Sequence, residues 1–277
     1  MTYHLIKGTF HVVGYAPDGD SIRFVASDPA HWSAFKWKTK AAQNNPRKQL
    51  RLEGIDALET HYEGFHQPRA FALAALQTLL GLLGIQGVTF NLAMTSITAA
   101  SDGTPGYLAV LGLDRYDRPI ALAFAGDTPL ADGSAVESTG LNLDASVNAQ
   151  LLQLGLAYPT FYDSMPDDLM ARFATLTQAA RASRTGLWAL DRTGGFAFWG
   201  LNTIQDDMIV LPKLFRRLIE FMLASSDTAE LGPYLTKSSS RVLLRSSGKR
   251  TTLGKLVSVN GRQVSLIEPP EELIFTA

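Results

Sequence analysis

The sequence contains no cysteine among its 277 residues. This absence excludes disulfide bonds, thiolate nucleophiles and zinc sites built on thiolates. An excess of one charge is also missing, because 25 Lys and Arg stand against 26 Asp and Glu, for a net charge of −1. The whole molecule therefore has no field that attracts nucleic acid, and any such attraction has to be local. With 46% hydrophobic and 18% charged residues, the composition indicates a soluble globular protein.

Long apolar runs are also missing. The most apolar stretch, residues 71–85, is too short to span a bilayer and is interrupted by Gln77, Gly81 and Gly84. The N-terminal residues alternate in polarity and lack the apolar segment of a secretory signal. We therefore expect no membrane partner and a cytoplasmic location.

The pattern of apolar residues predicts several short strands and three helices over residues 1–192. We expect helices at residues 68–83, at 144–154 with Asp144 as N-cap, and from Asp167 to Gly186. The predicted strands are residues 10–14, 22–24, 49–55, 88–92, 107–113 and 119–124, with Asp18-Gly19 as a hairpin turn after the first. Short strands with one helix inserted, followed by further helices, predict an α+β fold built on an OB-like five-stranded β-barrel.

Residues 193–277 are predicted to form a second, smaller α+β extension of unknown role. An amphipathic helix is expected over Leu214–Met222, behind Pro212, and Asn260-Gly261 is expected to join two strands of a hairpin. Residues 231–267 contain seven Lys and Arg and no acid. This basic run is interpreted either as a solvated face or as a surface for nucleic acid or another partner.

The helix at residues 68–83 is apolar on nearly every side, whereas a surface helix shows a single apolar stripe. We infer that another segment covers its second face, and the helix at 214–222 is the favoured candidate. If that helix does not cover it, helix 68–83 is the expected interface of a homodimer.

Residues 27–48 mix tryptophans with basic residues, among them Trp32, Trp37 and Lys48. Such a segment suits the stacking of single-stranded bases. The alternative, which we favour, is that the tryptophans pack on the barrel, because aromatic side chains are usually buried.

Five polar residues near predicted strand ends suit phosphodiester hydrolysis. Asp20 and Asp56 offer oxygen ligands to a hard divalent cation, and Glu59 is placed to take a proton from water as a general base. Arg51 and Arg118 suit a phosphate and the charge that grows on it. Each residue taken singly is more often structural, so the joint pattern carries the hypothesis.

The order and spacing of these residues resemble the staphylococcal nuclease (thermonuclease) family. The resemblance covers residues 8–190. It rests on Asp-Gly-Asp at 18–20, on Arg51 five positions before Asp56 and Glu59 three after it, and on Asp-Arg-Tyr-Asp-Arg at 114–118. Val147-Asn148 followed by Gly155-Leu156-Ala157 also matches.

The resemblance implies a metal-dependent endonuclease that cuts DNA and RNA with little sequence preference. Asp20, Asp56 and the carbonyl of Ala57 would be ligands of calcium or another divalent metal, and Glu59 would be the base. Arg51 and Arg118 would clamp the phosphate, with Arg115 and Tyr116 near a terminal phosphate of the substrate.

Two positions depart from the family pattern. Ala57-Leu58 stands where the family has Thr-Pro, and Asp117 stands where it has a glycine. We expect the carboxylate of Asp117 to weaken substrate binding or to draw Arg118 into a local pair. The alternative hypothesis is therefore an OB-type nucleic-acid or protein-binding module with weak or absent catalysis.

Overall fold

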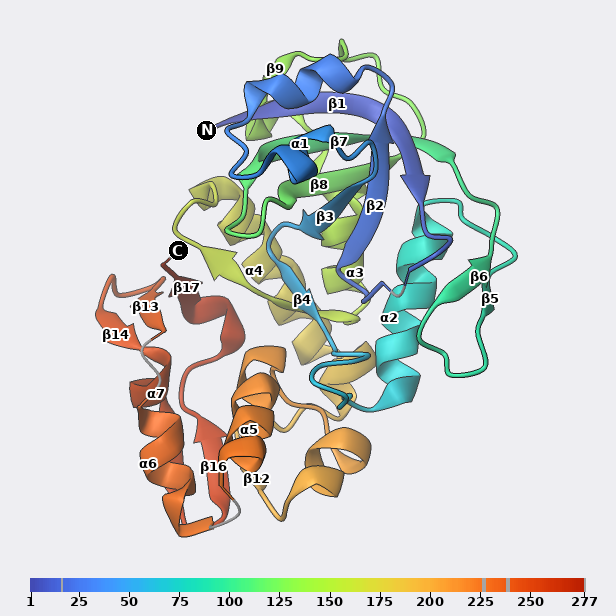
Figure 1. Cartoon of the computed structure of the whole chain (residues 1–277). Coiled ribbons are helices and arrows are strands. Elements are labelled where there is room, and N and C mark those ends of the chain that lie inside the picture. Colours follow the sequence, from blue (N-terminus) through green and yellow to red (C-terminus); the bar gives the residue numbers. More distant parts are fainter. Residues whose placement is uncertain (16, 226–227, 238–239, 277) are drawn as a thin grey trace. The chain divides into compact units, whose positions relative to one another are not determined.

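The computed structural model describes residues 1–15, 17–225, 228–237 and 240–276 (Figure 1). The chain divides into two compact units. We call Met1–Glu53 with Leu76–Leu151 the barrel unit, and Gly54–Ala75 with Leu152–Ala277 the second unit. The predicted domain boundary between residues 192 and 193 stays a prediction.

The barrel unit contains a closed five-stranded β-barrel, as predicted. Its strands follow the order β2-β3-β8-β7-β1, and pairing of β1 with β2 closes the ring. Within this ring, β3 and β8 pair in parallel, and β9 (Ala135–Glu137) extends the sheet beside β1. Alternate residues such as Phe10, Ile22, Leu50 and Leu52 are fully buried. The barrel strands are β1 (Thr2–His11), β2 (Ser21–Ala26), β3 (Lys48–Leu52), β7 (Thr104–Leu113) and β8 (Pro119–Ala125).

Two predicted strand boundaries of the barrel were wrong. The strand predicted over residues 10–14 ends at His11. β1 and β2 still pair as the predicted antiparallel hairpin, and the amide of Ser21 donates to the carbonyl of Asp18 at 3.3 Å. The strand predicted over residues 49–55 ends at Leu52, because Gly54 turns the chain with a φ of 76°. Ile55–Ala57 then form a separate strand, β4. Outside the barrel, this unit also contains α1 (Lys40–Asn44) and the short pair β5 (Thr89–Phe90) and β6 (Ile97–Ala99).

The three predicted helices are α2 (Arg69–Leu82), α3 (Val147–Gln153) and α4 (Asp167–Ala182). The N-cap predicted at Asp144 was wrong, since that residue lies in a short 3₁₀ turn, Leu143–Ala145. Ser146 caps α3 instead, because its hydroxyl accepts a hydrogen bond from the amide of Ala149 at 3.1 Å. Within the described parts of the chain, no helix has the length and apolar character needed to cross a membrane.

The tryptophan segment packs in the way we favoured for Trp32. This residue lies in the 3₁₀ turn Pro29–Ala34 and is buried. The indole of Trp37 donates to the carbonyl of Trp32 at 2.9 Å. The buried ammonium of Lys48 lies 4.4 Å from the centre of the Trp37 ring. These side chains therefore hold one another in place.

The second unit combines helices with small sheets. The helices besides α4 are α5 (Pro212–Ala224), α6 (Leu231–Thr236) and α7 (Leu253–Leu256). The predicted hairpin is confirmed as β15 (Val257–Asn260) and β16 (Gln263–Leu266), joined at Gly261. The other pairings are β4 with β10 (Ala157–Pro159), β12 (Phe196–Ala197) with β16, and the sheet β11 (Phe161–Tyr162), β17 (Leu273–Phe275), β13 (Arg241–Leu244) and β14 (Arg250–Thr252).

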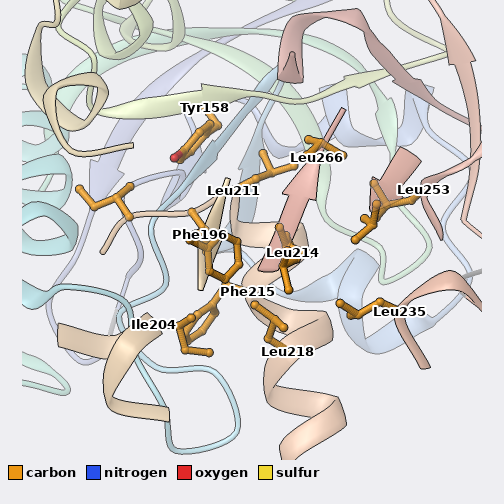
Figure 2. Close-up of a cluster of buried hydrophobic side chains, with 14 of the residues drawn as sticks. Tyr158, Phe196, Ile204, Leu211, Leu214, Phe215, Leu218, Leu235, Leu253 and Leu266 are labelled. Carbon is orange, nitrogen blue, oxygen red and sulfur yellow. The ribbon is translucent and has the colours of Figure 1, made fainter. Parts of the chain in front are cut away.

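A buried cluster of apolar side chains forms the core of the second unit (Figure 2). The apolar face of α5, with Leu214, Phe215 and Leu218, packs in the same cluster as Tyr158. Ala72, from the first turns of α2, belongs to this cluster as well. The predicted helix at 214–222 is thus confirmed. The apolar cluster to which it belongs also contains Ala72, near one end of the predicted helix 68–83. A homodimer through that helix stays a prediction.

Candidate functional site

The eight predicted site residues fall into two groups, each described within its own unit. The barrel unit holds Asp20, Arg51, Arg115, Tyr116 and Arg118, and the second unit holds Asp56, Ala57 and Glu59.

Strand register brings Asp20, Arg51 and Arg118 to one end of the barrel. Ser21, which follows Asp20, pairs with Arg51 across β2 and β3, and the amide of Leu52 donates to the carbonyl of Asp20 at 3.0 Å. Arg51 pairs with Ile120 across β3 and β8, two residues after Arg118. Three neighbouring strands therefore place these side chains at a common level.

A buried carboxyl group lies next to this end of β3. Glu53 is 5% exposed and accepts a hydrogen bond from the hydroxyl of Tyr3 at 3.0 Å. Burial raises the pKa of Glu53 to about 7, and the hydrogen bond from Tyr3 and the charge of Arg51 only partly oppose this. Glu53 is therefore a group that titrates near neutrality inside the barrel unit.

Arg118 is held by Asp114. Its Nε and Nη2 atoms lie 2.8 and 2.7 Å from Oδ2 of Asp114. The other carboxylate oxygen of Asp114 accepts from the amides of Tyr116 and Arg118 at 2.8 and 2.9 Å. One carboxylate thus shapes the turn and orients the guanidinium of Arg118, whose side chain is 34% exposed.

Asp117 does not pair with Arg118, so that expectation was wrong. Asp117 has a φ of 62° and accepts hydrogen bonds from the amides of Lys38 and Thr39, each at 2.9 Å, at the start of α1. The first of these bonds is the main cause that lowers the pKa of Asp117. Its negative charge serves a loop contact within the barrel unit.

Arg115 and Tyr116 lie on the outside of the same turn. The Tyr116 side chain is 64% exposed, and the guanidinium of Arg115 lies 4.7 Å from the centre of its ring. The guanidinium of Arg118 lies 5.6 Å from that centre. Two guanidinium groups beside an exposed ring suit a phosphate with an adjoining base.

Asp56 and Ala57 lie in β4, beyond the end of the strand predicted over residues 49–55. Asp56 pairs with Tyr158 and Ala57 with Ala157 in the antiparallel β4–β10 ladder. Both Asp56 and Ala57 are buried. This pairing fixes the direction in which the carboxylate of Asp56 leaves the strand.

Glu59 follows β4 and is fixed by Gln67. The amide of Gln67 donates to the carbonyl of Glu59 at 2.9 Å, and the side chain of Gln67 accepts from the amide of Glu59 at 3.2 Å. Gln67 in turn donates to the carbonyl of Val210 at 2.7 Å. Glu59 is 8% exposed and therefore has a restricted orientation.

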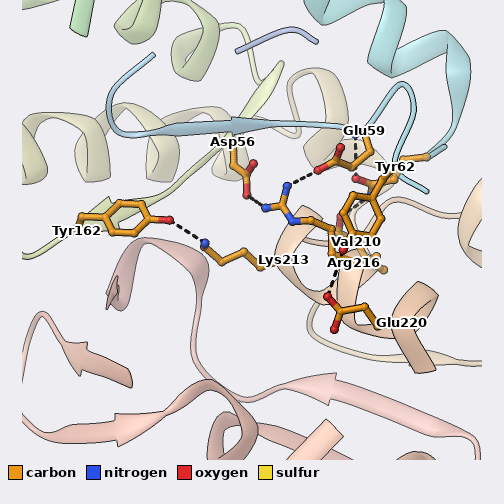
Figure 3. Close-up of polar contacts among 9 residues, drawn as sticks. Asp56, Glu59, Tyr62, Tyr162, Val210, Lys213, Arg216 and Glu220 are labelled. Carbon is orange, nitrogen blue, oxygen red and sulfur yellow. Dashed lines mark hydrogen bonds and ion pairs between the residues drawn. The ribbon is translucent and has the colours of Figure 1, made fainter. Parts of the chain in front are cut away.

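Arg216 of α5 bridges the two carboxylates (Figure 3). Its Nη2 lies 2.7 Å from Oδ2 of Asp56, and its Nη1 donates to Oε1 of Glu59. The carboxylate side chains are 9% and 10% exposed, and that of Arg216 is 26% exposed. Asp56 and Glu59 therefore converge on one cationic group.

The same face of α5 makes two more polar contacts. Lys213 donates to the hydroxyl of Tyr162 at 2.9 Å, and Glu220 accepts from the hydroxyl of Tyr62 at 3.1 Å (Figure 3). Arg216 was not predicted from the sequence. Its only sequence signal is the polar stripe of residues 213, 216 and 220, which lies opposite the apolar face of this helix.

The donor chemistry of Asp56 and Glu59 fits a hard cation, since both supply carboxylate oxygens to one point. That point is taken by the guanidinium of Arg216. Over the residues that the structure describes, no three His, Cys, Asp or Glu side chains are grouped to hold a metal ion. The pair therefore fits a metal by type, whereas a full ligand set is not assembled.

The comparisons with known proteins agree with the barrel and the site segment. No curated protein matches the chain at a significant level. Residues 49–190, half of the chain, match the family described as staphylococcal nuclease homologue. This match contains Arg51, Asp56, Glu59 and the turn at residues 114–118, and the chain belongs to the staphylococcal nuclease homologue family.

Proposed function

We propose that this protein is a nuclease that hydrolyses phosphodiester bonds of DNA or RNA with little sequence preference. It requires a divalent metal, and calcium is the metal that we propose before any other. The observation that carries the proposal is that the carboxylates of Asp56 and Glu59, both within the segment that matches the family, converge on one cationic group, the guanidinium of Arg216. Family membership by itself supports only a nuclease-like or nucleic-acid-binding role.

The chain's own residues have separate roles in this proposal. Arg51 and Arg118 bind the phosphate and the charge that develops on it, and Arg115 with Tyr116 holds a neighbouring phosphate and base. Glu59 accepts the proton of the attacking water. A metal held by Asp56 and the carbonyl of Ala57 would polarise the phosphoryl oxygen, and Asp20 as a further ligand stays a prediction of the family resemblance.

The test is a cleavage assay on the full chain with single-stranded DNA and with RNA, in calcium and in excess chelator. We expect cleavage that stops with chelator and falls at least about a hundredfold in Glu59→Gln, the usual loss for a general base. Cleavage that survives both treatments would contradict the proposal.

Glu63→Gln is the matched control, because Glu63 is exposed and lies four residues from Glu59 in the same segment. It removes the same charge without touching the carboxylate pair. A fall in activity equal to that of Glu59→Gln would mean that charge alone, and not a positioned base, is responsible.

The second candidate is a nucleic-acid-binding module without catalysis. The pairing of Arg216 with both carboxylates favours it, since a permanent pair would leave no base for water. This candidate predicts that single-stranded DNA binds and stays intact in calcium, magnesium and manganese alike. Turnover in any of these metals would exclude it.

A further inference from the structure

Arg216 is a fixed part of the second unit and not a loose surface side chain. Its neighbours in α5, Phe215 and Leu214, are buried at 0% and 1% exposure in the cluster of Figure 2. Leu218, on the next turn, is buried as well. The helix backbone therefore holds Cα of Arg216 in place, and only the side chain can swing away.

The guanidinium and a metal ion would need the same carboxylate oxygen of Asp56 and the space beside Glu59. A hard cation takes carboxylate oxygens at about 2.3–2.6 Å. Oδ2 of Asp56 already lies 2.7 Å from Nη2 of Arg216, and Oε1 of Glu59 accepts from Nη1. Two cations in this space would repel each other, so one excludes the other.

The geometry of the ion pairs of Arg216 with Asp56 and Glu59 also makes them strong. The two terminal nitrogens of one guanidinium address two different carboxylates, both about nine-tenths buried. Charge-assisted bonds of this kind are shorter and stronger than neutral ones, and they strengthen further where water is scarce. Without Arg216, two negative groups would face each other in a poorly solvated place.

We propose that Arg216 is an internal cation that competes with divalent metal for Asp56, pairs at the same time with Glu59, and so keeps this site closed to metal until its side chain moves. This inference deepens the proposed function, on which it rests, because it assigns the control of metal entry at the same site. The class of ligand that opens the site is a divalent cation.

The test measures calcium binding, not cleavage. The full chain is stripped with chelator, and calcium chloride is titrated in a calorimeter into wild type, Arg216→Gln and Arg217→Gln. We expect Arg216→Gln to bind calcium at least about tenfold more tightly than wild type, because one opposing charge is gone. Equal affinity of wild type and Arg216→Gln overturns the inference.

Arg217→Gln is the matched control. Arg217 is the next residue of α5, and its Nη1 is 2.5 Å from Glu220, away from the carboxylate pair. It loses the same charge and should bind calcium as wild type does. A gain equal to that of Arg216→Gln would assign the effect to net charge and overturn the inference.

Two further variants keep the test sharp. Arg216→Gln combined with Asp56→Asn should lose the gain, and a gain that persists would place calcium elsewhere and overturn the inference. Arg216→Lys keeps the charge and the fold but lacks the fork that spans two carboxylates. It should gain less calcium affinity than Arg216→Gln, and a gain equal to that of Arg216→Gln would mean that the positive charge does not exclude calcium and would overturn the inference.

The outcomes separate this inference from the proposed function. If Arg216→Gln gains calcium affinity and no variant cuts DNA or RNA, the internal cation is supported and the nuclease is not. If wild type cuts in calcium and Arg216→Gln gains no affinity, the nuclease is supported and the internal cation is not.

Discussion

Asp114 binds the guanidinium of Arg118 and, with its other oxygen, the backbone amide of the same residue at 2.9 Å. The side chain of Asp114 is only 6% exposed. One carboxylate therefore fixes both the backbone and the side chain of the arginine assigned to phosphate.

Removing this carboxylate should destabilise the barrel unit. Asp114→Ala leaves two amides of the turn without their acceptor, and we expect a loss of about 2 kcal/mol in the free energy of unfolding. Urea denaturation measures it. Asp127→Ala is the control, since Asp127 pairs with Lys7 but is 87% exposed, and it should destabilise the protein far less than Asp114→Ala does. Equal losses of unfolding free energy in the two variants would mean that the hydrogen bonds of Asp114 to the turn do not stabilise the barrel unit.

Arg118 itself should reveal its phosphate contact through salt dependence. For single strands, each phosphate neutralised adds about 0.7 to the slope of log binding constant against log salt. Arg118→Gln should lower that slope by about 0.7 and weaken binding similarly on all sequences, whereas loss of base reading would be selective. Fluorescence anisotropy with single-stranded DNA at several salt concentrations gives the slope. An unchanged slope would mean that Arg118 does not contact a phosphate of the bound strand.

The barrel was predictable because its signals are local. Alternation around Phe10, Ile22 and Leu50 marks strands wherever they occur in the fold, and the turn at Gly261 identified the late hairpin. The break after Leu52 was missed, because a lone glycine within an alternating run does not show the sign of its φ. Only the structure gives Gly54 its φ of 76°.

The partners of the candidate site residues were not predictable from the sequence. Spacing makes Asp56, Glu59 and Arg118 candidates without revealing which charges face them, and their roles stay predictions. Arg216 is 160 residues from Asp56 along the chain, and nothing in its own helix distinguishes it from Arg217. The same holds for Asp117, whose bonds to Lys38 and Thr39 depend on how a distant loop folds.

Glu53 should make the stability of the barrel unit depend on pH. Its pKa is raised to about 7 in the folded state, so the folded chain binds a proton that the unfolded chain has already lost above its ordinary value of 4.5. The stabilisation is complete below pH 4.5 and is lost as the pH rises through 7. Between about pH 5 and pH 8 we expect it to fall by on the order of 3 kcal/mol.

The measurement compares urea denaturation of wild type and Glu53→Gln at about pH 5, 6.5 and 8, the range over which the raised pKa acts. The amide introduced by Glu53→Gln can still accept a hydrogen bond from the hydroxyl of Tyr3 but cannot ionise. The free energy of unfolding of the variant should therefore rise relative to that of wild type as the pH rises. Exposed Glu63→Gln is the control and should follow wild type. A constant difference between Glu53→Gln and wild type across this range would mean that Glu53 does not titrate there.

Gly54 should be the least replaceable glycine near the site, for two reasons. Its φ of 76° strains any other residue, and an added Cβ would lie 2.7 Å from the ring of Phe173 and 2.8 Å from the methyl group of Met165. Gly54→Ala should therefore cost about 2–4 kcal/mol of unfolding free energy.

Gly64→Ala separates the two reasons. Gly64 has a φ of 84°, and an added Cβ there meets nothing within 4 Å, so only the backbone strain of about 1 kcal/mol remains. Urea denaturation of both variants gives the difference that packing against Phe173 and Met165 causes. If Gly54→Ala costs no more unfolding free energy than Gly64→Ala, the side chains of Phe173 and Met165 move aside for the new Cβ. Their packing against Gly54 would then not be what fixes the turn that leads into Asp56.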